Sequence, residues 1–98
     1  MKLLELILAV KEKNLTKTQL EEYRDDLANL FAQMQFELAE IRKKKAAYWL
    51  EQPQKTDVAT RRYWEASHDG GREIELSHYS KATEKILSSL KSRLYNVY

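Results

Sequence analysis

The stretch that decides the fold is residues 17–52, KTQLEEYRDDLANLFAQMQFELAEIRKKKAAYWLEQ, which contains no glycine and no proline. Apolar residues recur in it at a spacing of seven, which is typical of a stripe along one face of a helix. The residues at this spacing are Leu20, Leu27, Met34, Ile41 and Tyr48. One helix over the stretch would be roughly 50 Å long at about 1.5 Å per residue. Because a rod of that length cannot bury its own stripe, we expect other helices to pack along it.

The ends of this long helix carry recognisable signals. Thr16 and Gln19 fit a capping box, in which the threonine hydroxyl and the glutamine side chain each bond a backbone N–H of the other residue. Pro53 ends the helix, because the residue before a proline is pushed out of helical space. Before the capping box, residues 2–13 are good helix formers and predict a short first helix.

The sequence after Pro53 predicts two more helices separated by a break. Residues 57–68 form the third helix, with Thr56 or Asp57 as its cap. Asp69-Gly70-Gly71 is the expected break, and residues 72–96 form the fourth helix. Positions 76, 83, 90 and 97 of this segment are again seven apart, which predicts that the fourth helix packs antiparallel along the long one.

A β-hairpin is the alternative for residues 59–80. Asp69-Gly70 is a typical hairpin turn, and Ile74 and Leu76 alternate as they would in a strand. The density of Glu, Lys and Ala on both sides of the turn favours helix instead. The predicted fold class is therefore all-α, an elongated helical hairpin or bundle that forms a single domain over residues 1–98.

Length and composition narrow the classes of protein further. The chain has 98 residues, a net charge of +2 and no cysteine, so disulfides, thiol catalysis and cysteine-ligated metals are excluded. Its longest apolar run, residues 3–10, is far shorter than the ~20 residues that span a bilayer. It also lacks the cleavage site of a secretory signal, so we expect a cytoplasmic protein that makes no membrane contact.

The sequence does not favour catalysis. It contains no nucleophile elbow, phosphate loop, dinucleotide-binding glycine pattern or zinc-protease motif, so we predict a protein that is not an enzyme and needs no cofactor. Glu75 and His78 have the Glu-x-x-His spacing of carboxylate di-iron bundles. That site needs two such motifs and this chain has one, so no metal site is predicted.

Charge and aromatic residues are concentrated around Pro53. Residues 1–41 hold five Lys or Arg against eight Asp or Glu, a balance of −3, whereas residues 42–98 hold twelve against seven, a balance of +5. If the chain doubles back at Pro53, a basic and aromatic cluster forms at one end of the hairpin, with Lys45 opposite Tyr63. Its members are Arg42, Lys43, Lys44, Lys45, Tyr48, Trp49, Lys55, Arg61, Arg62, Tyr63 and Trp64.

This cluster predicts binding of single-stranded nucleic acid. Lysine and arginine neutralise phosphates, and exposed rings stack on unpaired bases for about 1–3 kcal/mol each. The alternative is that the four rings belong to the hairpin core and that the lysines extend from it into water.

The first helix is expected to bury nearly all of its circumference. Its apolar residues either pack on the rest of the fold or mediate self-association, which would make the protein a homo-oligomer. The residues expected to do this are Leu3, Leu4, Ile7, Leu8 and Val10.

The closing stretch HYSKATEKILSSLKSRLYNVY, residues 78–98, resembles short helical early-region proteins of tailed phages. Over roughly residues 34–95 the order of elements is also distantly similar to UvsY-type recombination mediators. Those are small oligomeric proteins that bind single-stranded DNA, a single-strand binding protein and a recombinase. The matching positions are Arg42 to Lys45, Tyr48, Trp49 and Lys91-Ser92-Arg93, and the resemblance implies that Lys43, Lys44 and Lys45 contact DNA. This chain differs by its additional apolar helix at residues 3–10.

The expected function is that of a non-enzymatic, phage-type accessory protein in recombination or replication. It would bind nucleic acid or a protein–DNA complex through the basic and aromatic end. One alternative is a protein-binding inhibitor or adaptor, such as a counter-defence factor that acts on a host nucleic-acid enzyme. Another is a coiled-coil assembly or scaffold protein.

Overall fold

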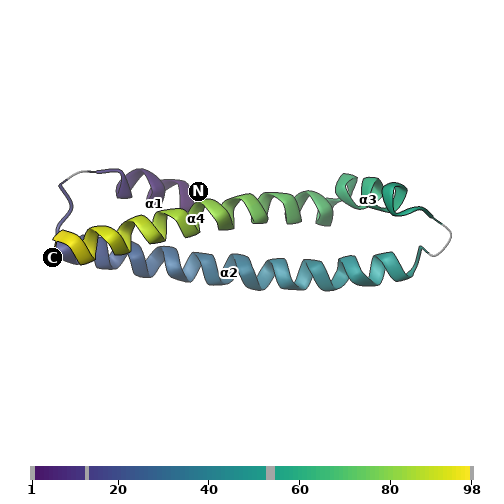
Figure 1. Ribbon diagram of the computed structural model, residues 1–98, viewed down its shortest axis with the longest axis horizontal. Helices are drawn as coiled ribbons and strands as arrows, with labels where there is room; N and C mark the ends of the chain where they lie inside the picture. Colours follow the sequence, from purple (N-terminus) through teal and green to yellow (C-terminus); the bar gives the residue numbers. More distant parts are fainter. Residues whose placement is uncertain (1, 13, 53–54, 98) are drawn as a thin grey trace.

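The computed structural model describes residues 2–12, 14–52 and 55–97, which form four helices. These are α1 (Lys2–Val10), α2 (Lys17–Leu50), α3 (Asp57–Ala66) and α4 (His68–Val97). The molecule is a rod of 58 × 19 × 17 Å. Figure 1 shows α2 and α4 side by side and antiparallel, with α1 and α3 at opposite ends. The predicted all-α hairpin is confirmed. The β-hairpin alternative for residues 59–80 is wrong, because the described part of that segment is helical.

The residues spaced seven apart form the contact between α2 and α4. Leu20, Leu27 and Ile41 are buried on α2, and Leu76 and Leu90 are buried on α4. The repeat position between those last two, residue 83, holds a threonine, which is also buried. Its hydroxyl donates to the carbonyl of residue 79, so this polar group is satisfied inside the interface. The predicted antiparallel pairing of the two long helices is therefore confirmed.

The short helix α1 lies over one end of this pair. Leu3, Leu6 and Val10 are buried there in one cluster with leucines of α2 and α4. Arg93 of α4 donates to the carbonyl oxygens of Val10 and Glu12 at 2.8 and 3.0 Å, and so supplies a cation to the carbonyl end of α1. The helix ends at Val10, earlier than the predicted residue 13.

Thr16 caps α2 as predicted, and of the two candidates for α3 the cap is Thr56. The backbone N–H of Gln19 donates to Thr16 Oγ1 at 3.1 Å, and the N–H of Thr16 donates to the Gln19 side chain at 2.9 Å, so the capping box is present. Thr56 caps α3 by accepting from the N–H of Ala59 at 3.2 Å. The helix α2 ends at Leu50, two residues before the predicted end, and Pro53 lies outside the described residues.

The break between α3 and α4 lies at Ser67, so the expected break at Asp69-Gly70-Gly71 is wrong. Ser67 has extended backbone angles, and its Oγ accepts from the N–H of Gly70 at 3.0 Å, which makes it the cap of α4. Both glycines lie inside α4 with negative φ. A Cβ at Gly70 would lie 1.7 Å from the carbonyl oxygen of Trp64, whereas one at Gly71 would meet nothing within 4 Å. Gly70 therefore allows the first turn of α4 to approach α3 closely, and this contact outweighs the helix-breaking tendency of about 1 kcal/mol.

Candidate nucleic-acid interface

The end of the rod formed by α3 and the last turns of α2 carries exposed cations. We call it the tip and define it by Lys43, Lys44, Lys55, Arg61, Arg62 and Tyr63. All five cationic residues are exposed. Lys43 forms an ion pair of 3.5 Å with Glu40, and Lys55 Nζ lies 4.3 Å from the centre of the Tyr63 ring. Among the described residues, Lys44, Arg61 and Arg62 have no acidic partner.

The four rings predicted for this end are divided between core and surface. Trp64 is 4% exposed, so a stacking role for this ring is corrected to a core role. It points inward because it lies one turn after Thr60 on the buried face of α3. Tyr48 and Trp49 are half-buried, and the Tyr48 ring lies 5.7 Å from that of Trp64 and 6.0 Å from that of Trp49. Tyr63, at 61% exposure, keeps a ring open to solvent.

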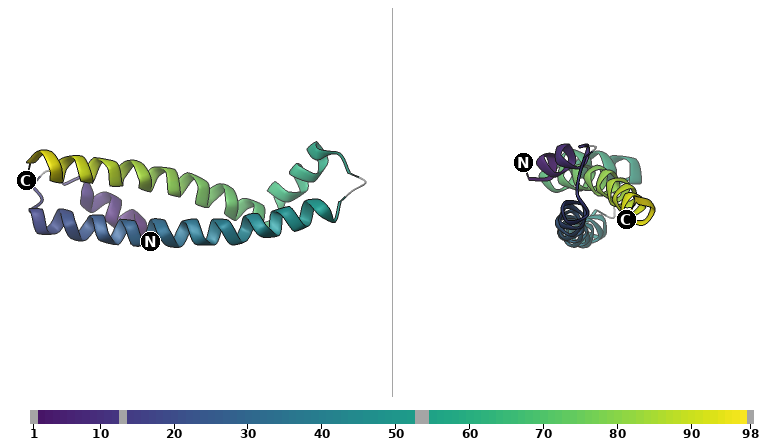
Figure 2. Two further views of the ribbon diagram at one scale, coloured as in Figure 1. Left: turned by 60° about the horizontal axis from the view of Figure 1, so that its bottom comes forward. Right: turned by 90° about the vertical axis from the view of Figure 1, so that its left-hand side faces the viewer.

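The predicted neighbours of Lys45 are also different from the observed ones. The sequence predicts Lys45 opposite Tyr63, but the Nζ atom of Lys45 bonds Glu73 of α4 at 3.1 Å and lies 5.6 Å from the centre of the Trp49 ring. The reason is the geometry of α3, which meets α4 at the bend at Ser67 and slants away from α2 (Figure 2). The first turns of α4, rather than α3, therefore face Lys45.

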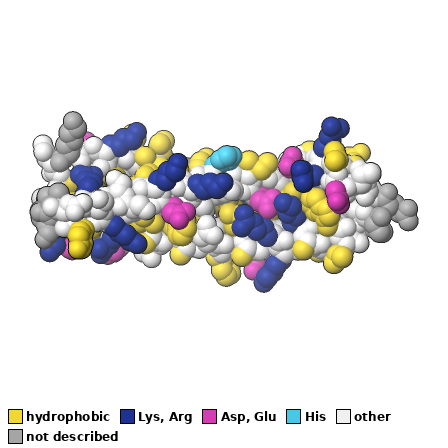
Figure 3. All heavy atoms as spheres, in the orientation of Figure 1, with side chains coloured by type: hydrophobic (Ala, Val, Ile, Leu, Met, Phe, Trp, Pro, Cys, Tyr) yellow, Lys and Arg dark blue, Asp and Glu magenta, His cyan; other side chains and the backbone are white. Residues whose placement is uncertain are grey.

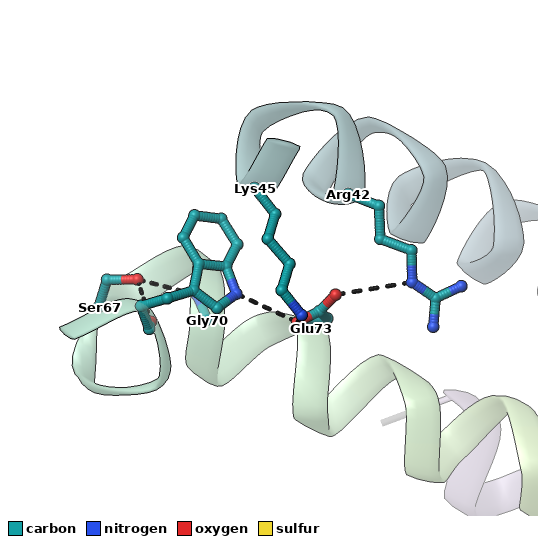
Figure 4. A network of polar contacts seen from close by, with 6 residues as sticks. Arg42, Lys45, Ser67, Gly70 and Glu73 are labelled. Carbon is teal, nitrogen blue, oxygen red and sulfur yellow. Dashed lines mark hydrogen bonds and ion pairs between the residues drawn. The ribbon is translucent and has the colours of Figure 1, made fainter. Parts of the chain in front are cut away.

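Glu73 joins α2, α3 and α4 (Figure 4). Its Oε1 accepts from Lys45 Nζ and from the indole N–H of Trp64, both at 3.1 Å, and its Oε2 lies 3.6 Å from Arg42 Nε. Burial alone would raise the pKa of Glu73. The hydrogen bonds from Trp64 and Lys45 and the charges of Lys45 and Arg42 outweigh that effect and lower its pKa. Glu73 is therefore a carboxylate at neutral pH.

Sequence reasoning missed Glu73, although a signal was available. Glu73 precedes the buried Leu76 by three positions and the buried Ser80 by seven, so it lies on the inward face of α4. An acidic residue on such a face needs a cationic partner from the facing helix. The basic run that begins at Arg42 supplies that partner, which makes part of this run structural.

A groove with basic walls lies between α2 and α4 beside Glu73. It has a volume of about 400 Å³, and we call it the basic groove. Its lining residues are Arg42, Lys45, Glu73, Ile74, Ser77, His78 and Lys81. Three cations thus face one carboxylate. Of the Glu-x-x-His pair, His78 lines this groove, whereas Glu75 binds Arg72 Nη1 at 3.0 Å, and the described residues contain no cluster of three metal-ligating side chains.

The residues predicted for self-association fall on both faces of α1. Leu3 and Val10 are buried within the chain itself, so these two are corrected to core positions, and the half-buried Ile7 packs against the same cluster. Leu4 and Leu8 are 53% and 57% exposed. Because they are four residues apart, they form one small apolar face on the outer side of the helix.

Comparisons with known proteins add no family to these observations. The chain matches no protein-family model, and searches of curated proteins and of solved structures returned no match. Among the described helices, none combines the length and the hydropathy that a bilayer-spanning segment requires.

Proposed function

We propose that this protein is a non-enzymatic accessory protein that binds single-stranded nucleic acid through the tip. The observation that supports this most is the set of exposed cations Lys44, Arg61 and Arg62, which have no acidic partner among the described residues. Uncompensated cations of this kind release counterions from a phosphate backbone when they bind it, and this release drives association. Tyr63 adds one exposed ring on which a base can stack.

The expected binding is mainly electrostatic. Since Trp64 is buried and two other rings are half-buried, stacking contributes through Tyr63 more than through the remaining rings. Contacts to phosphate carry no sequence information, so we expect little preference among single-stranded sequences. In line with the likeness to tailed-phage early-region proteins and UvsY-type mediators, the proposed cellular role is in recombination or replication.

The test is fluorescence anisotropy of a labelled oligothymidylate at increasing salt. On single strands the log–log slope is about −0.7 per phosphate contact, so five tip cations give a slope near −3.5. The double variant Arg61→Ala/Arg62→Ala should reduce that slope by about 1.4. The matched control is Lys11→Ala/Lys17→Ala, which removes the same charge from exposed positions at the other end of the rod.

Two results contradict the proposal. One is an equal loss of affinity in the tip variant and in the control, which would indicate attraction by overall charge. The other is no binding by the wild type below about 100 μM at physiological salt, which is the range of non-specific nucleic-acid binders.

A protein partner at the tip is the second candidate, and the outer face of α3 favours it. Val58 and Tyr63 are exposed there around a hollow of about 510 Å³ that Arg62 also lines. Tyrosine and arginine are the residue types that dominate protein interfaces. An inhibitor or adaptor of a nucleic-acid enzyme would use this face. Val58→Ser separates the two candidates, because it removes apolar contact without changing charge and should leave oligonucleotide affinity within about twofold.

We also propose that two copies associate through Leu4 and Leu8. These two leucines are 53% and 57% exposed on the outer face of α1, and burial of that face against a second copy would remove apolar surface from water. Light scattering should give twice the monomer mass, and Leu4→Glu/Leu8→Glu should restore the monomer. Phe36→Glu, a change at an exposed apolar residue of α2, is the control that should leave the dimer intact. A wild-type protein that is monomeric at about 100 μM contradicts this interface. Larger assemblies that form without nucleic acid would favour a scaffold instead.

A further inference from the structure

The basic groove is built from side chains of both long helices. Arg42 and Lys45 line it from α2, and Ser77, His78 and Lys81 line it from α4. Figure 3 shows Lys and Arg side chains along the middle of one face of the rod, on both sides of a histidine. Apart from Arg42 and Lys45, none of these residues belongs to the basic and aromatic cluster predicted from the sequence.

Two arginines near the groove are held in different ways. Arg72 is fully engaged, because its Nε and Nη2 donate to Glu37 at 3.2 and 2.9 Å and its Nη1 donates to Glu75 at 3.0 Å. The hydrogen bond to Glu37 raises the pKa of Arg72. Arg42, by contrast, faces Glu73 through Nε alone, and its side chain is 58% exposed. Its two terminal nitrogens point away from the carboxylate and have no acceptor among the described residues (Figure 4).

This arrangement leaves Arg42 able to bind an anion. A guanidinium presents its N–H groups in a planar fork that matches two oxygens of one phosphate. Glu73 fixes the Nε side of the fork, and Lys45 compensates the charge of Glu73 through a bond of 3.1 Å. Glu73 is the one carboxylate that lines the groove beside three cations, so the groove keeps a net positive charge, and Lys81 has no ion pair with any described residue.

Further donors continue along α4 from the groove. Ser77 supplies a hydroxyl, and Lys81 and Lys85 follow at intervals of four residues, so that all three lie along one face of the helix. Lys81 and Lys85 also line a second hollow of about 430 Å³ with Ser88 and Glu84. The row thus contains one acidic residue beside its two lysines, and it runs away from the tip along the rod.

We infer that the basic groove binds phosphate groups of a single-stranded nucleic-acid backbone, so that the strand runs from the tip along α4. Arg42 and Lys81 contact phosphate oxygens from opposite walls, and Ser77 donates its hydroxyl to the same group. This inference rests on the proposed function, because it concerns a second contact of the same strand. It adds residues of α4 to the interface and predicts how long a bound strand has to be.

The length follows from helix geometry. From the start of α3 to Lys81 the chain contains about 24 helical residues in two segments, which span at most roughly 35 Å at 1.5 Å per residue, since the segments meet at the bend at Ser67. A stacked strand covers about 3.4 Å per nucleotide, so a strand of on the order of ten nucleotides reaches from the start of α3 to Lys81. Lys43 and Lys44 of the tip are neighbours of Arg42 on α2, so a strand of five nucleotides binds either the tip cations of α3 or the groove with these neighbours, and not both.

The experiment compares oligothymidylates of five and fifteen nucleotides by anisotropy at constant salt. Arg42→Gln/Lys81→Gln should weaken binding of the fifteen-nucleotide strand at least about tenfold, because two charged hydrogen-bond donors are lost. This variant leaves Arg61 and Arg62 of α3 intact as a binding site for a five-nucleotide strand, so the affinity for that strand should change less than about twofold. Lys81→Gln/Lys85→Gln, at two exposed positions of α4, repeats the test without touching the contacts of Glu73. The control Lys11→Gln/Lys91→Gln removes two exposed charges outside the groove.

The outcomes separate this inference from the proposed function. If the wild type binds the fifteen-nucleotide strand and both groove variants bind it equally well, the groove is not part of the interface, although the tip proposal stands. If the groove variants lose affinity for both lengths in equal proportion, the strand does not run from the tip to the groove, and the inference is also wrong. If the wild type binds neither strand, the proposed function fails and this inference fails with it.

Discussion

Different kinds of contact hold the helices together at the two ends of the rod. At the end that α1 covers, the buried residues are aliphatic: Leu3, Leu6, Val10, Leu20, Leu27 and Leu90. At the α3 end, Leu38, Ile41 and Leu76 pack with Trp64, whose indole bonds the partly buried carboxylate of Glu73. Burial of aliphatic surface is non-directional, whereas the contacts of Trp64 and Glu73 need particular distances and angles. The α1 end is thus a repeating hydrophobic core, and the α3 end is a joint with specific geometry.

The two ends also differ in what they contribute: the α1 end stabilises the fold, and the α3 end carries the proposed binding surface. Cations without acidic partners lie at the α3 end, where the bend at Ser67 directs α3 away from α2 (Figure 2). We therefore expect substitutions in the α1 end to act on folding, and those at exposed cations of the α3 end to act on binding. Substitutions at Leu27, Gly70 and Glu73 therefore measure how far the joint differs from the hydrophobic core.

The largest effect is expected in the hydrophobic core. Leu27→Ala removes a side chain with no exposed surface and leaves a cavity, so it should lower the free energy of unfolding by about 2–5 kcal/mol. Urea denaturation followed by circular dichroism measures this. Phe36→Ala, at an exposed position of the same helix, should change stability by less than about 0.5 kcal/mol. A loss below about 1 kcal/mol for Leu27→Ala would mean that this end is not the main core.

The second effect distinguishes two adjacent glycines at the joint. A methyl group at Gly70 would overlap the backbone of Trp64, so Gly70→Ala should cost about 1–3 kcal/mol as α3 and α4 move apart. Gly71→Ala meets open space in a helix and should stabilise by about 0.5–1 kcal/mol. Thermal unfolding and tryptophan fluorescence report both changes. If the two variants have the same midpoint, the close approach of α3 and α4 is not part of the folded structure in solution.

The smallest effect depends on pH and concerns Glu73. Glu73→Gln should cost about 1–2 kcal/mol at neutral pH, because it weakens the charged hydrogen bonds from Trp64 and Lys45. The pKa of Glu73 is lowered in the folded state, so below the ordinary glutamate value of about 4.3 the unfolded chain takes up a proton first. The contribution of Glu73 is therefore present above that value and is lost as the pH falls through the lowered pKa.

The measurement is the free energy of unfolding between pH 3 and pH 7. The difference between the wild type and Glu73→Gln should shrink as the pH falls through this range. The exposed Glu65, which has no ion pair with any described residue, provides the control Glu65→Gln, which should stay parallel to the wild type. A constant difference between the wild type and Glu73→Gln at all pH values would show that the carboxylate charge contributes nothing to the joint.

Most of the fold was predictable because its signals are local or periodic. Thr16 and Thr56 cap helices within three residues of themselves, and the sevenfold spacing of leucines follows directly from helix geometry. The bend at Ser67 was not predicted, because two glycines usually indicate a break more strongly than one serine. The position of the break depends on the close approach of Gly70 to the carbonyl of Trp64, and no sequence pattern indicates that approach.

The candidate site was predictable in part for the same reason. The basic run and the rings lie near one another along the chain, and several of the cations are exposed at the tip as the expected site requires. The sequence pattern places Trp64 and Lys45 in the nucleic-acid site, yet both bond Glu73, which is on another helix. Likewise, Leu3 and Val10 were assigned to self-association, although they complete the core of their own chain.

The sequence by itself determined four helices, two of their caps and the antiparallel pairing of the long ones. These features depend on backbone hydrogen bonds and apolar spacing within short stretches of chain. The tertiary structure decided which rings are buried, which cations are paired and where α3 turns away. Those outcomes depend on which side chains meet across helices, and a single carboxylate at residue 73 changes the role of a tryptophan, a lysine and an arginine that are distant from it in sequence.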